Sequence, residues 1–298
     1  MSTLAEPLVL QRERDLVPLV RLLSRLHVDG DFQHPGGMEW WLRRLVQDDF
    51  DVHLWYSGAE VAAFVVDDAG FVIVRTGRPD VISRAALLDW AEARGRARGR
   101  ESIEISVDAA DRVANKDLAA RGYVSAETGG AELVRLLDAA PPQPVLPPGY
   151  TMTTLETVDE DAYVALHRAA WSTHAPSAYR RELHDVVTAM PDFRRDMVPI
   201  VVAPDGALAA SCIGWLDVPS RSAEIEPLGT HPDHRRLGLA TAIVHEVARR
   251  ARERGARSIM VWGSHNNHAA IETYTSAGHE PRRSVHELRK PLRNVQSN

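Results

Sequence analysis

Hydrophobic and polar residues follow one another in the same order in the two halves of the chain. Each half begins with two amphipathic stretches of helical period, which are residues 15–26 and 38–47 in the first half and 160–171 and 179–190 in the second. Each pair precedes two β-rich runs around a tight turn, within residues 52–66 and 199–210, a pattern typical of a β-hairpin. With the segments that follow, we predict the order β-α-α-β-β-β-α-β-α-β for each half.

An internal repeat supports this duplicated order. Gly255 and Gly99 stand 156 positions apart (255 minus 99), and so do Ser258 and Ser102. The predicted helices of the repeat are residues 83–98 and 239–254, and the strands after them are residues 102–107 and 258–262. Such self-similarity indicates two domains of one architecture.

A proline-rich segment separates the two halves. Five prolines fall within residues 138–149, a composition that favours an extended, semi-rigid linker. We therefore predict a first domain over residues 1–138, a linker over 139–149 and a second domain over 150–298. A chain of 298 residues is long enough for two domains, each with its own core.

Composition and charge exclude several classes of protein. The net charge of −6, without a basic tail, argues against a nucleic-acid partner. The only cysteine, Cys212, lies in an apolar strand-like run, which favours a buried core residue and a reducing compartment. No apolar run approaches the roughly 20 residues of a membrane span, and the first 15 residues do not resemble a signal peptide. We expect a cytoplasmic protein with no membrane partner.

One segment carries clear chemistry, because a strand there runs into a basic turn that opens a helix. The turn contains Arg235-x-x-Gly238-x-Ala240. Gly238 and Ala240 allow close approach of a ligand to the backbone, and amides at a helix N-terminus form an anion site. Arg235 and Arg236 add charge-assisted donors. The pattern predicts a pyrophosphate as the ligand.

A second motif downstream makes the pair specific. It reads Asn267-x-x-Ala270-x-x-x-Tyr274-x-x-x-Gly278, followed by His279. Together the two motifs resemble the GNAT superfamily of N-acetyltransferases, with Thr230 in place of the usual Val and His279 in place of the usual Phe. The resemblance is firm over residues 208–278 and weaker over the rest of the second half.

The resemblance implies the fold, the cosubstrate and its binding residues. The expected fold class is α/β (α+β), with two tandem GNAT domains, each a mixed, mainly antiparallel sheet flanked by helices. The expected cosubstrate is acetyl-CoA, and no metal is expected. The residues expected to bind acetyl-CoA are Leu228, Gly229, Thr230, Arg235, Arg236, Leu237, Gly238, Leu239, Ala240, Thr241 and Asn267.

The catalytic acid and base are expected on two different elements. Tyr274 matches the family's general acid, whose phenol protonates the departing thiolate; a helix tyrosine that caps the core is the alternative. Glu224 and Glu226 point to one face of a strand, so either could accept the amine proton. Alternatively they bind a cationic acceptor or face solvent. Pro227 cannot donate to a ladder and predicts a bulge that opens the sheet.

Two aromatic segments are candidates for the acceptor site. Trp171, His174 and Tyr179 lie between the first two predicted helices of the second half, a region that covers the acceptor cleft in the family. In the first half, His34-Pro-Gly-Gly-Met-Glu-Trp-Trp41 could line an acceptor site, although a turn followed by core aromatics is the preferred interpretation.

The first half keeps the repeat but not the motifs. The offset places Leu118 opposite Tyr274, and residues 74–82 contain no Arg-x-x-Gly-x-Gly/Ala pattern. We therefore interpret the first half as a degenerate GNAT domain. The predicted function is transfer of an acetyl group from acetyl-CoA to a primary amine of a small molecule. The partners considered are this amine acceptor and a second copy of the chain in a homodimer. The alternatives are an enzyme of the mycothiol-synthase type and a non-catalytic acetyl-CoA sensor.

Overall fold

The computed structural model describes residues 6–172 and 176–292, whose contacts form two compact units. Within these ranges, the first unit comprises residues 6–26, 44–131 and 283–292, and the second comprises residues 27–43 and 132–282. Neither unit is one continuous stretch of sequence. The domain boundaries around the proline-rich linker stay a prediction about how the chain is organised.

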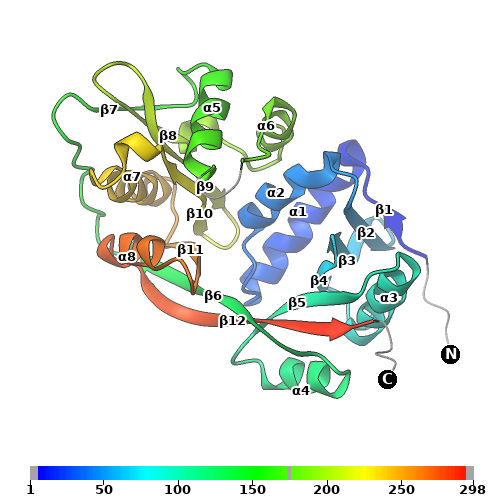
Figure 1. The fold of residues 1–298 in the computed structure, drawn as a ribbon. Helices are drawn as coiled ribbons and strands as arrows, with labels where there is room; N and C mark the ends of the chain where they lie inside the picture. Colours follow the sequence, from blue (N-terminus) through cyan, green and yellow to red (C-terminus); the bar gives the residue numbers. More distant parts are fainter. Residues whose placement is uncertain (1–5, 173–175, 293–298) are drawn as a thin grey trace, which may run out of the picture. The chain divides into compact units, whose positions relative to one another are not determined.

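The first unit is a mixed sheet flanked by helices (Figure 1). Its strands lie in the order β1-β2-β3-β4-β5-β12, and neighbouring strands are antiparallel except β4 with β5. The strands are β1 (Leu8–Val9), β2 (Phe50–Ser57), β3 (Glu60–Asp68), β4 (Phe71–Thr76), β5 (Ser102–Asp108) and β12 (Glu280–Pro291). The helical segments are α1 (Arg12–Val28), η1 (Arg43–Val46), α3 (Arg84–Ala97) and α4 (Arg112–Ala120).

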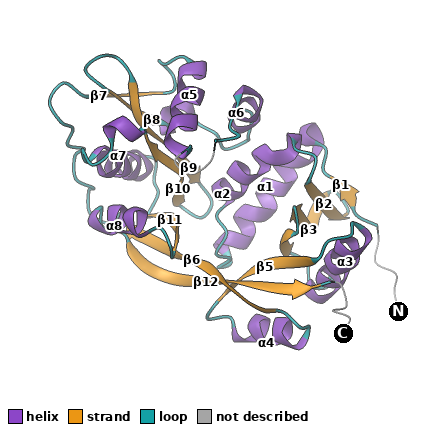
Figure 2. Cartoon of the chain, in the orientation of Figure 1, coloured by secondary structure: helices purple, strands orange, loops and turns teal. Residues whose placement is uncertain are grey.

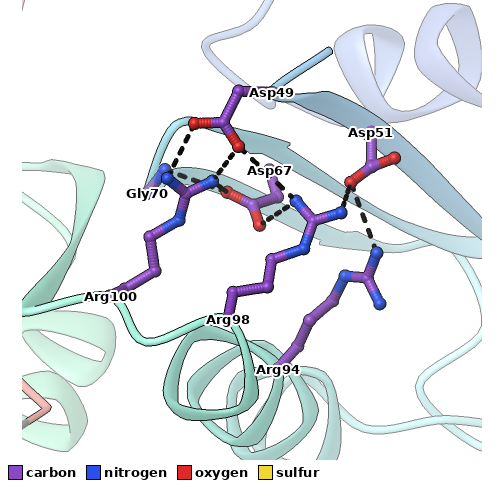
Figure 3. Close-up of polar contacts among 7 residues, drawn as sticks. All are labelled: Asp49, Asp51, Asp67, Gly70, Arg94, Arg98 and Arg100. Carbon is purple, nitrogen blue, oxygen red and sulfur yellow. Dashed lines mark hydrogen bonds and ion pairs between the residues drawn. The ribbon is translucent and has the colours of Figure 1, made fainter.

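A network of arginines and aspartates ties α3 to the sheet of the first unit (Figure 3). The network consists of Asp49, Asp51, Asp67, Arg94, Arg98 and Arg100. Asp67, almost fully buried, accepts from the Gly70 amide at 2.9 Å and lies 3.3 Å from the Arg98 guanidinium. The carboxylates are thus neutralised within the network itself, as buried charges must be.

The second unit repeats the same architecture (Figure 2). Its strands lie in the order β6-β11-β10-β9-β8-β7, with β10 and β11 parallel; of β6, residues 132–136 belong to this unit and residues 124–131 to the first. The strands are β6 (Val124–Leu136), β7 (Thr151–Thr154), β8 (Pro199–Val202), β9 (Leu208–Asp217), β10 (Ser222–Thr230) and β11 (Ser258–Ser264). The helical segments are α2 (Pro35–Leu42), α5 (Glu160–Trp171), α6 (Arg181–Thr188), η2 (Arg195–Met197), η3 (Pro232–His234), α7 (Leu239–Glu253) and α8 (His268–Ser276).

Helices α7 and α2 pack on opposite faces of β9 in this second unit. A Cβ on Gly214 would lie 2.6 Å from Val247 of α7, whereas Trp215, the next residue, meets Gly36 of α2. Neighbouring residues of a strand point to opposite faces, so β9 lies between the two helices. Trp215 is fully buried by this packing.

The structure confirms the predicted order of elements in both halves and the predicted fold class. The repeat also recurs at the predicted offset: β5 and β11 begin 156 residues apart (258 minus 102), and so do α4 and α8 (268 minus 112). One interpretation was wrong. Residues 35–37 are the first turn of α2 and not a separate turn, because Pro35 occupies the N1 position, where its missing N–H costs nothing.

Candidate active site

The sheet of the second unit opens at the middle of β10. Ser222–Glu224 pair in parallel with Ser258–Met260 of β11, and both strands continue beyond these pairs. On its other edge, β10 pairs with β9, but the register shifts between Ile225 and Leu228. The bulge predicted at Pro227 is therefore present. Beyond it, Leu228–Thr230 pair with Ala210–Cys212 of β9, whereas the described pairing with β11 ends at Glu224, so the other edge of their backbone is available to an extended ligand.

The basic turn leads into an exposed, uncapped start of α7. Gly238 is the N-cap residue with a left-handed φ of 77°, and no side chain caps the helix. A Cβ added to Gly238 would meet no atom within 4 Å, so the space beside this residue is open. Uncapped N–H groups and the helix dipole together favour a bound anion. The corresponding helix of the first unit, α3, is instead capped by the Ser83 side chain.

The two arginines of the turn differ in their contacts. Arg235 donates from Nε to the Thr230 carbonyl at 3.3 Å and from Nη2 to the Ala170 carbonyl at 3.0 Å. These bonds hold the turn against the end of β10 and the end of α5. Arg236 adopts a left-handed φ of 61° and is exposed, as are Leu237 and Gly238. Leu239 is buried, whereas Ala240 and Thr241 are half-buried.

The second motif lies on α8. Asn267 is the N-cap of this helix, and its side chain accepts from the Ala270 amide at 3.2 Å. Tyr274 is 7% exposed, and burial, with the nearby Glu226 carboxylate, raises the pKa of its phenol. His279 packs edge-on against Tyr274, with ring centroids 6.0 Å apart, and burial lowers the pKa of His279 to about 4. A neutral histidine thus takes the aromatic position that the family gives to Phe.

Glu224 is buried, and its carboxylate contacts two residues: His34, directly before α2, and Gly37, within α2. It is 1% exposed, and its Oε2 accepts from the Gly37 amide at 2.5 Å. The same oxygen lies 3.4 Å from Nδ1 of His34. Burial raises the pKa of Glu224 to about 8, although the hydrogen bond from Gly37 works in the opposite direction.

Glu226 occupies a different environment on the same strand. It is half-buried, and burial together with the neighbouring Glu224 raises the pKa of its carboxyl to about 7. The charge of Arg43 opposes this shift. Glu226 in turn raises the pKa of the Tyr274 phenol, which indicates that these two groups lie within electrostatic range of each other. A half-exposed carboxyl that titrates near neutrality has the properties of a general base.

The candidate acceptor residues lie in different surroundings. Trp171, at the end of α5, is 50% exposed, and its indole stacks on His167. Tyr179 is 4% exposed and bonds to Nδ1 of His184 at 3.0 Å, with its ring 3.9 Å from that of His167. Tyr179 is therefore packed as a core aromatic. His174 lies outside the described residues.

The structure adds a group of site residues that the sequence did not reveal. Gly37 and His34 contact Glu224, and Arg43 stacks its guanidinium 3.9 Å over Trp40 within range of Glu226. All of them come from residues 27–43, which belong to the second unit. The Pro-Gly-Gly sequence drew attention to this segment, but only tertiary contacts show what it touches.

Comparison with known proteins identifies the family. The model of the Acetyltransferase (GNAT) family matches residues 160–279, which contain the bulged strand, the basic turn and Tyr274. The chain is also 30% identical over 267 residues to the mycothiol acetyltransferase of Sanguibacter keddieii, covering 80% of this chain and 81% of that protein. The chain belongs to the GNAT family and is an acyltransferase.

Solved structures of similar fold extend over the whole chain. A tandem GNAT protein from the clavulanic acid biosynthesis pathway aligns with a TM-score of 0.66 at 18% identity, covering 98% of this chain and 99% of that one. A GCN5-related N-acetyltransferase from Sphaerobacter thermophilus gives a TM-score of 0.61 at 21% identity, covering 93% and 92%. At these identities the comparison supports the tandem fold alone.

Within residues 6–172 and 176–292, no group of three or more His, Cys, Asp or Glu side chains could hold a metal ion. Among the helices described, none combines the length and apolar character needed to cross a membrane.

The buried state of Glu224 predicts how stability depends on pH. Between the ordinary pKa of 4.5 and about 8, the folded chain keeps a proton that the unfolded chain has released. This difference lowers stability by up to about 1.4 kcal/mol per pH unit as the pH rises. We expect Glu224→Gln to gain thermal stability over the wild type progressively from pH 5 to pH 8, measured as the difference in Tm.

Glu246 of α7 is the matched control, because it is another buried glutamate of the same unit. Burial opposes its ionisation, but hydrogen bonds from Arg249 and Arg250 together lower the pKa of Glu246. Its contribution to stability is present above the ordinary pKa and lost as the pH falls. Glu246→Gln should therefore cost stability at pH 7 and less at low pH. A Tm difference for Glu224→Gln that does not change with pH would refute the buried, protonated state.

Proposed function

We propose that this acyltransferase moves an acetyl group from acetyl-CoA to a primary amine of a small molecule, within a ternary complex. One observation carries the proposal: the uncapped, exposed N-terminus of α7 lies directly after the strand that bulges and parts from β11. A pyrophosphate fits the amides around Gly238, and an extended arm fits the open edge of Leu228–Thr230.

The residues around the opening are suited to the proton transfers. Acetyl-CoA supplies the activated thioester. Glu226 accepts a proton from the acceptor ammonium, and the freed amine nitrogen forms a bond to the thioester carbon. Backbone N–H groups near Leu228 stabilise the oxyanion. As the carbon–sulfur bond breaks, Tyr274 donates its proton to the leaving sulfur, and the nitrogen releases its second proton, which reprotonates the tyrosinate through solvent. The raised pKa of Tyr274 keeps the phenol protonated until the sulfur leaves.

The acceptor is proposed from the most extensive sequence similarity reported above. The S. keddieii relative is a mycothiol acetyltransferase, and the alignment spans most of both chains. We therefore propose the desacetylated form of mycothiol as the first acceptor to test. Trp171, half-exposed beside the end of β10, is the candidate side chain for contact with it. A protein that only senses acetyl-CoA is the weaker alternative, because Tyr274 and both glutamates are kept.

The proposed acetyl-CoA site can be tested by measuring binding. Acetyl-CoA should bind once per chain in titration calorimetry. Arg235→Ala combined with Gly238→Asp should abolish binding, because it removes one cation and places a carboxylate on the helix N-terminus. Arg78→Ala, in the loop before the capped helix α3, should leave the affinity unchanged. Two equivalent sites per chain, or full affinity in the double variant, would contradict the assignment.

The proposed role of Tyr274 as the general acid can be tested by enzyme kinetics. Tyr274→Phe removes only the hydroxyl group, so it should lower kcat by roughly 10²-fold or more. Acetyl-CoA affinity should stay within a few-fold of wild type, because the anion site is elsewhere. Unchanged turnover would end the proposed role, and a loss confined to affinity would make Tyr274 a binding residue.

The proposed acceptor can be tested by screening amines for the release of coenzyme A. A panel of small amines that includes desacetylated mycothiol should show release of coenzyme A above the background hydrolysis. We expect desacetylated mycothiol to give the highest kcat/KM. A preference for simpler amines would leave acetyl transfer intact but reject the mycothiol-type acceptor. Acetyl-CoA binding without release for any amine would instead favour a sensor.

A further inference from the structure

We propose that Trp215 of β9 is a positioning residue for the general base, because its indole N–H anchors the backbone of Glu226 inside the bulge of β10. The inference rests on the proposed function, in which Glu226 takes a proton from the acceptor. The contact is a hydrogen bond of 2.6 Å from Nε1 of Trp215 to the carbonyl oxygen of Glu226. Trp215 therefore acts on the position of the base and not on the proton itself.

The bulge leaves Glu226 without a partner in the sheet. The register with β9 shifts between Ile225 and Leu228, so two residues of β10, Glu226 and Pro227, face a single residue of β9. On the other side of the strand, the described pairing with β11 ends at Glu224. In the described registers Glu226 thus has no Cα partner on either side. The ladder does not fix where its side chain points, so another contact has to do so.

Trp215 is placed to supply this contact. It lies directly opposite Glu224 in the register, and Glu226 is its diagonal neighbour two positions further along β10. Diagonal neighbours of an antiparallel pair are about 7–8 Å apart, which is within reach of an aromatic side chain. The indole N–H is a donor only, so it suits a carbonyl acceptor. A phenylalanine at this position would fill the same region but would bring no donor.

The indole is held by packing as well as by its hydrogen bond. A Cβ added to Gly36 of α2 would lie 2.1 Å from Cβ of Trp215, so the backbone of this glycine packs directly on the base of the side chain. Phe193 packs edge-on against the ring, with centroids 5.9 Å apart. Helix α2 also ties down this second neighbour, because Glu39 accepts from the Asp192 amide at 3.0 Å. The direction of the N–H is therefore set by the surrounding structure.

An anchored backbone fixes the side chain that it carries. A general base must lie within hydrogen-bond reach of the proton that it takes, and a displacement of about 1 Å can cost about 10²-fold in rate. A buried indole usually bonds its N–H, so a contribution to folding alone is the competing explanation. The two explanations differ in one measurable respect. A positioning residue loses its effect on turnover once the carboxyl of Glu226 is gone, whereas a purely structural residue does not.

The first experiment removes the donor and keeps the ring. Trp215→Phe deletes the N–H together with part of the indole, and Trp215→benzothienylalanine, introduced site-specifically, replaces only the N–H by sulfur. With the best amine of the panel, we expect both variants to lower kcat by roughly 10-fold or more and to leave acetyl-CoA affinity unchanged in calorimetry. The matched control is Trp55→Phe, another buried indole, which belongs to the core of the first unit and should leave kcat unchanged.

A double-mutant cycle separates positioning from folding. Glu226→Gln alone should lower kcat by roughly 10²-fold or more. In this background, either change at Trp215 should have no further effect, because it acts through the missing carboxyl. If Trp215→Phe does not fold, the benzothienylalanine variant completes the cycle, since it keeps the shape of the indole. Losses that add, or full turnover in the benzothienylalanine variant, would overturn the proposal.

The anchor itself can be measured without an acceptor. In ¹⁵N NMR of the indole groups, the signal that disappears in Trp215→Phe belongs to Trp215. Its proton should exchange with deuterium oxide roughly 10²-fold or more slowly than that of Trp171, which is 50% exposed. Equal exchange rates for the two indoles would show that the hydrogen bond is absent and would overturn the anchor.

Failure of the inference and failure of the proposed function give different results. A wild type that turns over no amine rejects the proposed function, and the positioning role with it. Full turnover in Glu226→Gln rejects Glu226 as the base, with the same consequence for Trp215. If the wild type is active and Glu226→Gln is not, full activity in both Trp215 variants rejects the inference alone.

Discussion

The close approach of the first turn of α2 to strands β9 and β10 is the contact on which the arrangement of the site depends. Gly36 and Gly37 lie directly against Trp215 and Glu224, where no Cβ could fit. The approach buries one strand carboxyl completely and leaves the next, Glu226, half-exposed. Two chemically identical groups, two residues apart, thus acquire different proton affinities because one helix covers only one of them.

The second determinant is the pair of interruptions in regular structure around β10. The strand bulges between Ile225 and Leu228, and the helix after it begins at a glycine that no side chain caps. A continuous ladder and a capped helix would satisfy more of these backbone donors; Ser83 accepts from the Ala86 amide in this way at the start of the corresponding helix of the first unit. Leaving them unsatisfied costs stability, and ligand binding can recover this cost. The two units therefore share an architecture while differing in what their helix termini can bind.

The first unit shows what the same architecture does without these interruptions. Its strand-to-helix loop lacks the glycine pattern, and its charged residues neutralise one another in the network around Asp67 and Arg98 (Figure 3). The contribution of the first half to the site comes instead from residues 27–43, which the contacts assign to the second unit. Loss of the motifs in one copy therefore does not imply that its half of the sequence is without a role.

The sequence alone determined the order of the elements and the repeat, and it predicted an anion site, because these depend on local spacing: hydrophobic period, glycine positions and the residues of one turn. It could not distinguish Glu224 from Glu226, because both point to one face of one strand and differ only in what lies above them. That difference arises from Gly37 and His34, more than 180 positions away (224 minus 37 is 187). The tertiary structure alone brings them together, since burial and hydrogen bonding across such a separation leave no periodic trace in the sequence.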